Sequence, residues 1–316
     1  MVAEKVSRDE FIEIFNTVGP HATSRRTGVT IRRVYERART LRRQGFNLTS
    51  PMRPGGVPTD QIDYPEHIAL TIQNGNVLIG SDAHIWPGPP STAIRAFIKL
   101  IKDLKPKAVI LNGDVLDFPR ISRHAPIGWE KNPKPAEEIE AAQDILHEIE
   151  QEAGRGVQKI WPLGNHDARF ESQIAQHCPE YAKIKGIHLS DHFPAWQCCW
   201  LTMINDDVAV KHRMRGGIHA THNNVLWSGK TTVTGHLHSQ KVTPFTDYNG
   251  TRYGVDTGCM ADIYSPAFRN YMEEGPRNWR SGFGVLTFKD GFLLPPELVT
   301  VIDKTHVAFR GSLIKV

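Results

Sequence analysis

The feature that most constrains the fold is a series of five short blocks of His, Asp and Asn, each directly after a stretch that reads as a buried strand. The apolar stretches are expected as strands over residues 77–80, 108–111, 157–163, 208–211 and 232–234. The blocks that follow them are Asp82–His84, Gly113–Asp117, Gly164–Asp167, His212 and Gly235–His238. In an open α/β sheet, the active site usually lies at the carboxyl ends of the strands. The sequence therefore predicts an α/β fold with these polar side chains gathered at one edge.

The order of the blocks resembles that of the calcineurin-like metallophosphoesterases, whose pattern runs D-x-H, G-D-x-x-D, G-N-H-D/E, H and G-H-x-H. The resemblance covers roughly residues 76 to 260. It implies a sandwich of two mixed β-sheets flanked by helices. The stretch from Asp117 to Pro119 and the long segment after Gly258 resemble the phosphoesterases carried by bacteriophages.

The resemblance also implies a site for two divalent metal ions. Asp82 and His84 alternate along an extended segment, so both can turn toward one ion. By the family pattern, one metal is held by Asp82, His84, Asp114 and His238, and the other by Asp114, Asn165, His212 and His236. Two such ions can clamp a phosphoryl group and activate water.

His212 departs from the pattern, because the family usually has His-Gly where this chain has His212-Arg213. His219 and His222 are neighbouring alternatives, and His212 is preferred because it ends the apolar run 208–211. The mixed imidazole, carboxylate and amide ligands suit Mn, Fe, Zn, Co or Ni, with Mg also compatible. Manganese heads this list by resemblance.

Further residues around the metals receive roles from the same resemblance. His166 is expected to act as the general acid, with Asp167 orienting its imidazole. Asp117 is expected to orient the surrounding loop without binding metal, and Arg120 to grip the substrate phosphate. The alternative for Arg120 is an ordinary loop charge. No Ser or Cys nucleophile is required, since a water activated by the metals attacks phosphorus.

The bulk of the chain is typical of a globular protein of 316 residues, with 40% hydrophobic and 23% charged residues. No window approaches the ~18 apolar residues of a membrane span, and the charged start lacks a signal-peptide core. The four cysteines form no C-x-x-C pair. These features predict a cytoplasmic protein without a membrane partner, located in the host cytoplasm if the chain is phage-encoded.

The basic excess lies entirely in the first 50 residues, with ten Lys and Arg against five Asp and Glu. Helices are expected over 9–18, 21–27 and 30–41, with a tight turn at Gly28-Val29-Thr30. This arrangement resembles a helix-turn-helix unit, whose last helix enters the major groove of DNA. The residues expected to contact nucleic acid are Thr30, Arg32, Arg33, Arg37, Arg42 and Arg43. A solvated basic helix or a protein-binding unit is the alternative.

The chain is expected to divide into a helix-turn-helix-like unit over residues 1–46, a Pro/Gly-rich linker over 47–67 and a metallophosphoesterase domain over 68–316. The function predicted is dinuclear metal-dependent phosphoester hydrolysis by a phosphodiesterase or nuclease acting on DNA. One alternative is a phosphomonoesterase or protein phosphatase recruited through the N-terminal unit. Another is a DNA-binding regulator whose metal domain is structural or senses a ligand.

Overall fold

The structure is a computed structural model that describes residues 6–46, 48, 64–123, 131–265, 268 and 278–316, without the side chains of His21 and Arg43. The chain forms two compact units, residues 1–61 and 62–316, and each is described by itself. The predicted linker over 47–67 lies mostly outside the described residues.

The first unit is helical. Its helices are α1 (Arg8–Thr27) and α2 (Ile31–Arg43). Gly19 has φ 74° and ψ 172°, so α1 is broken before Pro20 into two helical pieces. Phe11 and Phe15 pack against Val34, Ala38 and Leu41 in a small core of their own.

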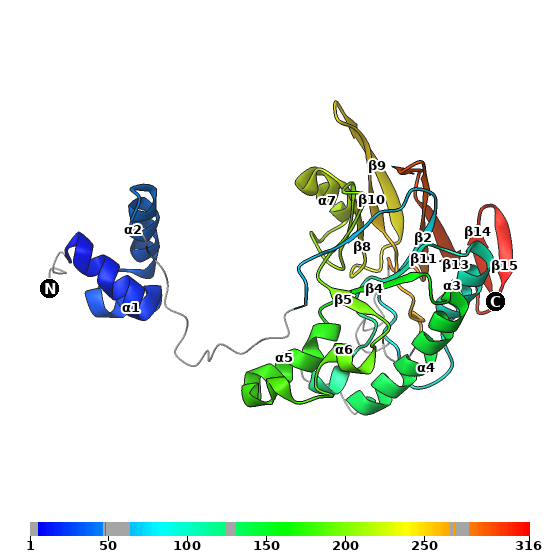
Figure 1. The fold of residues 1–316 in the computed structure, drawn as a ribbon, viewed down its shortest axis with the longest axis horizontal. Coiled ribbons are helices and arrows are strands. Elements are labelled where there is room, and N and C mark those ends of the chain that lie inside the picture. Colours follow the sequence, from blue (N-terminus) through cyan, green and yellow to red (C-terminus); the bar gives the residue numbers. More distant parts are fainter. Residues whose placement is uncertain (1–5, 47, 49–63, 124–130, 266–267, 269–277) are drawn as a thin grey trace. The chain divides into compact units, whose positions relative to one another are not determined.

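The second unit contains two mixed β-sheets, which confirms the predicted architecture (Figure 1). The smaller sheet has the strand order β1-β6-β7-β8-β10-β9. Its strands are β1 (Ile68–Leu70), β6 (Thr202–Ile204), β7 (Val208–Val210), β8 (Thr231–Thr234), β9 (Lys241–Asp247) and β10 (Gly250–Asp256). Strands β7, β8 and β10 run parallel, whereas β9 returns antiparallel to β10.

The larger sheet has the strand order β15-β14-β13-β11-β2-β3-β4-β5, with β12 paired to β11. Its strands are β2 (Gly75–Gly80), β3 (Ala108–Leu111), β4 (Gln158–Pro162), β5 (Gln197–Cys199), β11 (Gly282–Lys289), β12 (Phe292–Leu293), β13 (Glu297–Val301), β14 (His306–Phe309) and β15 (Ser312–Lys315). Strands β2 to β5 are parallel, and β11 to β15 extend the sheet antiparallel.

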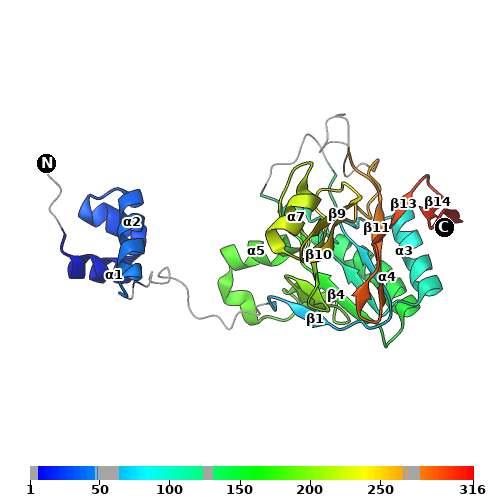
Figure 2. The ribbon, with the colours of Figure 1, turned by 90° about the horizontal axis from the view of Figure 1, so that it is seen from above.

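Helices flank the two sheets. They are α3 (Thr92–Leu104), α4 (Pro135–Ala153), α5 (Asp167–His177), α6 (Leu189–His192) and α7 (Ala220–Ser228), with 3₁₀ turns η1 (Pro119–Ile121) and η2 (Pro179–Lys183). Figure 2 shows α3 and α4 together beside the larger sheet and α7 beside β9 and β10. No helix in the described part of the chain is long and apolar enough to cross a membrane.

Strand β3 shows why the central strands are apolar throughout. Val109 and Leu111 face the core under α3 and α4, whereas Ala108 and Ile110 face the core between the sheets. Because both faces are buried, the strand shows no alternation of polar residues. Burial on both sides fixes where each central strand ends, and therefore where the polar blocks begin.

Candidate metal centre

The five predicted blocks meet at the carboxyl ends of β2, β3, β4, β7 and β8. Their side chains form three groups, and within each group the ligand atoms lie within 4.8 Å of one another. These groups are Asp82, His84 and His238; Asp114, His212 and His236; and His84, Asp117 and His166. The first two groups match the two ligand sets expected from the sequence, apart from Asn165 and the shared Asp114.

The first two groups adjoin one another through Asp82 and His212. Nε2 of His212 lies 3.0 Å from Oδ2 of Asp114 and 3.9 Å from Oδ1 of Asp82. Nε2 of His238 lies 3.1 Å from the same Oδ1 of Asp82. His212 Nδ1 donates a hydrogen bond to the carbonyl oxygen of Asn112, which turns its Nε2 toward the carboxylates. Neither His219 nor His222 joins a ligand group among the described residues.

Several buried polar atoms of these groups make no hydrogen bond within the described residues. They are Nδ1 and Nε2 of His84, Nε2 of His212, Nδ1 of His238 and Oδ1 of Asn165. A buried polar atom without a hydrogen bond destabilises the folded state. Where one occurs in a native protein, a bound ion or water commonly interacts with it. Imidazole nitrogens, carboxylates and an amide oxygen are ligands for divalent transition metals. The residues present therefore fit a pair of such ions.

The charges of the centre support this fit. Burial alone would raise the pKa of Asp82, but the imidazoles of His238 and His212 lower it to about 2. Burial would lower the pKa of His212, but the carboxylates of Asp114 and Asp82 raise it to about 10. The carboxylates thus create a strongly negative potential. This negative potential is balanced by positive charge, either by protons on the imidazoles or by metal ions that replace those protons.

The glycines that open two blocks are required by close packing. An added Cβ on Gly164 would lie 2.0 Å from Oδ1 of Asp114. An added Cβ on Gly235 would lie 2.4 Å from Oδ2 of Asp82. In each case a carboxylate of another block occupies the space that a side chain would need, so any larger residue would push a ligand out of place.

Asp167 does not orient His166, which corrects the expectation from the sequence. Its buried carboxylate instead accepts five hydrogen bonds, at distances from 2.8 to 3.2 Å. The donors are the backbone N–H groups of Asp114, Val115, Leu116 and Gly164 and the indole of Trp161. Asp167 begins α5 and points back under the loop after β3, so it holds that loop and, with it, Asp114.

Asp117 takes the orienting role instead. His166 Nδ1 lies 2.7 Å from Oδ1 of Asp117, and His84 Nδ1 lies 3.4 Å from the same oxygen. The indole N–H of Trp86 donates to the other carboxylate oxygen of Asp117. Burial would lower the pKa of His166, but Asp117 and Asp114 raise it. A raised pKa keeps an imidazole protonated at higher pH, as a general acid requires.

Two further residues of the site were not recognised in the sequence. Arg169 donates to the carbonyl oxygen of Asp117 and lies 3.1 Å from Nε2 of His166. Arg169 stands three residues after His166, and this spacing places two side chains on the same face of a helix. The spacing could therefore have indicated the contact between the two residues. Buried Glu138 accepts the backbone N–H groups of Asp117 and Phe118 and has no such local signal.

Arg120 lies outside the three ligand groups. It is exposed on η1, and its Nε donates to the carbonyl oxygen of Asn132. This contact fits the alternative of a loop charge. The expected contact with substrate phosphate would require the side chain to leave Asn132.

In the helical unit, the predicted nucleic-acid contacts fall into two sets. Thr30, Arg32 and Arg33 are exposed at the start of α2. Arg37 donates to the carbonyl oxygens of Val6 and Ser7, and Arg42 donates to that of Leu48. These two guanidinium groups also lie over the rings of Phe11 and Phe15. The side chain of Arg43 lies outside the described residues.

Comparisons with known proteins add relatives from bacteriophages. No family model matches the chain. The gene 54 protein of Mycobacterium phage L5 is 27% identical over 249 residues, which cover 72% of this chain and 93% of that protein. The gene 54 protein of Mycobacterium phage D29 is 26% identical over the same length and the same shares.

Solved structures superpose only loosely. Zinc-bound Vps29 from Entamoeba histolytica is 16% identical, with a TM-score of 0.40 over 76% of this chain and 98% of that one. The phosphoesterase Yfce from E. coli is 11% identical, with a TM-score of 0.33 over 70% and 97%. The Pseudomonas putida nuclease MPE is 12% identical, with a TM-score of 0.30 over 70% and 86%. Likeness at this level carries no argument about function.

Proposed function

We propose that the protein is a metal-dependent phosphoester hydrolase, and that it acts as a phosphodiesterase or nuclease on DNA. The observation that carries the proposal is the gathering of five sequence blocks into ligand groups, in which several buried nitrogen and oxygen atoms make no hydrogen bond within the described residues. Asp82, His84 and His238 would hold one divalent ion, and Asn165, His212 and His236 the second, with Asp114 shared. When bound, such ions neutralise the phosphoryl oxygens and lower the pKa of water.

The residues around the ions would move the proton to the leaving oxygen. His166 is the candidate donor, because its Nδ1 is held by Asp117 while its Nε2 lies 3.8 Å from Oδ2 of Asp114. Arg169 contacts Nε2 of His166 and would have to shift for that nitrogen to carry the transferred proton. Its guanidinium would then be free to meet a phosphate oxygen beside the reacting group.

DNA is proposed as the substrate because of the charge of the helical unit. Eight arginines lie between positions 25 and 43, against the single acid Glu36. Arg32 and Arg33 are exposed on α2, and such arrays of cations bind phosphate backbones. The unit would hold DNA while the metal centre hydrolyses a phosphodiester. Manganese is the proposed activator.

The proposal is tested by incubating the full chain with Mn and labelled single- and double-stranded DNA, beside Asp114→Asn. We expect hydrolysis that falls by on the order of 10³-fold in the variant, since the metal contribution amounts to several kcal/mol. Bis-p-nitrophenyl phosphate and p-nitrophenyl phosphate are measured in parallel. Turnover of the monoester alone would mean a phosphatase. No turnover of any substrate, with DNA still bound, would mean a binding protein.

A further inference from the structure

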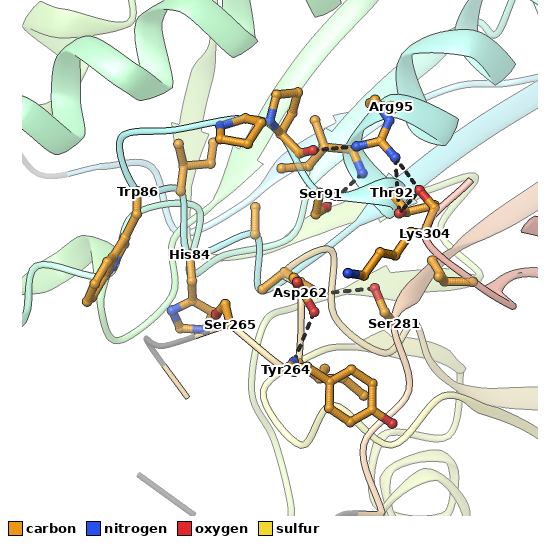
Figure 3. Close-up of a pocket in the computed structure, with 18 of the residues that line it drawn as sticks. His84, Trp86, Ser91, Thr92, Arg95, Asp262, Tyr264, Ser265, Ser281 and Lys304 are labelled. Atoms are coloured by element: carbon orange, nitrogen blue, oxygen red, sulfur yellow. Dashed lines mark hydrogen bonds between the residues drawn. The ribbon is translucent and has the colours of Figure 1, made fainter. Parts of the chain in front are cut away.

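A large cleft adjoins the metal centre, with a volume of about 1040 Å³. Its walls come from residues 83–92, 261–265, 279–281 and 300–304, with Ile94, Arg95 and Ile145. Figure 3 shows His84 and Trp86 on one side of it and Arg95 and Lys304 on the other. Binding sites for whole small molecules measure ~300–1,000 Å³. The cleft is therefore far larger than the phosphoryl group alone requires.

Three aromatic side chains line this cleft: Trp86, Tyr264 and Trp279. Trp279 lies at the metal end, with its ring centroid 4.5 Å from that of His238. Tyr264 is 78% exposed, although large aromatic side chains usually bury most of their surface. An exposed ring in a concave wall offers a flat apolar face to a flat ligand. Nucleobases are such ligands, and they stack on protein aromatics regardless of sequence.

The cations of the cleft differ in how they are used. The guanidinium of Arg95 donates to the carbonyl oxygens of Pro90 and Lys304, so it supports the wall. The side chains of Arg280 and Lys304 are exposed and form no hydrogen bond or ion pair among the described residues. The carboxylates of the lining, Asp262 and Asp303, accept backbone N–H groups of their own loops.

We propose that this cleft binds unpaired nucleotides next to the scissile phosphate. Their bases would stack on Tyr264 and the neighbouring tryptophans, and their phosphates would meet Arg280 and Lys304. This inference rests on the proposed function and names its substrate class more closely. Bases in a duplex are stacked on each other and offer no free face. The protein therefore acts on single strands or frayed ends in preference to intact duplex.

The test measures binding without metal, so that it does not depend on turnover. The full chain in EDTA is titrated into a short fluorescein-labelled oligothymidylate, and anisotropy gives the affinity. Tyr264→Ala is compared with Tyr248→Ala, a tyrosine that is fully exposed in the hairpin of β9 and β10. We expect Tyr264→Ala to weaken binding about tenfold, the usual effect of losing one stacked base. Tyr248→Ala should bind as the unaltered chain does.

Photocrosslinking with an oligonucleotide that contains 5-iodouracil identifies the residues that contact the bases. Crosslinks to residues 261–265 or to Trp279 support the cleft, whereas crosslinks confined to the helical unit overturn it. Equal affinities of the two tyrosine variants also overturn it. Hydrolysis of bis-p-nitrophenyl phosphate with Mn is measured on the same preparations. It reports on the phosphoesterase proposal separately, so each idea can fail without the other.

Discussion

The metal centre and the helical unit carry most of the functional charge of this chain, and they hold it in opposite ways. At the metal centre Asp82 is 0% exposed and Asp114 2% exposed. On α2 the side chain of Arg32 is 87% exposed. A buried charge must be matched by partners that the fold provides, whereas an exposed charge is solvated wherever it lies. At the metal centre, the positions of the charged groups therefore indicate their function. On α2, the number of exposed charges is the main indication of function.

The backbone shows the same contrast. Five expected metal ligands have φ between 40° and 68°, in the left-handed region that side chains with a Cβ rarely adopt: Asp82, His84, Asp114, His236 and His238. Within residues 6–46, positive φ occurs at glycines alone. Each such residue costs ~1–3 kcal/mol and persists where the surroundings over-determine it. The metal centre therefore depends on supporting contacts that the helical unit does not need.

Removing the contacts that hold the strained loop after β3 should destabilise the metal-centre unit strongly. Asp167→Ala leaves five buried donors without an acceptor. At ~1–3 kcal/mol for each unsatisfied group, partly relieved by relaxation, we expect a loss of about 4 kcal/mol in the free energy of unfolding. Urea unfolding followed by tryptophan fluorescence reports this, because all seven tryptophans lie in residues 62–316.

Asp144→Ala provides the matched control for that experiment, since Asp144 is exposed on α4. Its unfolding midpoint should stay close to that of the unaltered chain. If Asp167→Ala behaved like Asp144→Ala, the carboxylate would not be supporting the loop after β3.

A second substitution distinguishes a role of His166 in proton transfer from a role in holding the metal centre together. His166→Ala removes the candidate proton donor, and we expect turnover of a phosphodiester to fall by ~10²–10⁴-fold. Metal content, measured on the protein after gel filtration, should be retained because His166 belongs to neither expected ligand set. His147→Ala, an exposed histidine of α4, is the control and should keep its turnover. Loss of metal from His166→Ala would instead make the residue a ligand.

The strands and the ligand blocks could be predicted because their signals are local. Strands β2, β3, β4, β7 and β8 match the predicted apolar runs to within about two residues at each end, as is usual for such boundaries. Each block is contiguous with its strand, so placing the strand also places the block. The confirmed pair of mixed sheets follows from the same runs and from the family pattern.

The contacts between blocks could not be predicted in this way. Asp117 and His166 lie 49 residues apart, and which carboxylate reaches the imidazole depends on how α5 packs against the loop after β3. Asp167 is adjacent to His166 in sequence, but α5 starts at that residue and directs its side chain under the loop. Nearness in sequence favoured the wrong carboxylate, because a helix start separates neighbouring side chains in space.

Substituting the exposed arginines of α2 tests whether these side chains contact DNA. In the proposed complex, Arg32→Ala with Arg33→Ala leaves two phosphates without their cations. The slope of log Kobs against log salt for duplex DNA should then become shallower by ~0.9 for each phosphate that is no longer neutralised. Far-UV circular dichroism should not change, because both side chains are exposed.

Arg155→Ala, an exposed arginine in the other unit, is the control. Equal slopes for the two variants would mean that DNA does not contact the start of α2, and any binding would then have to come from other parts of the chain.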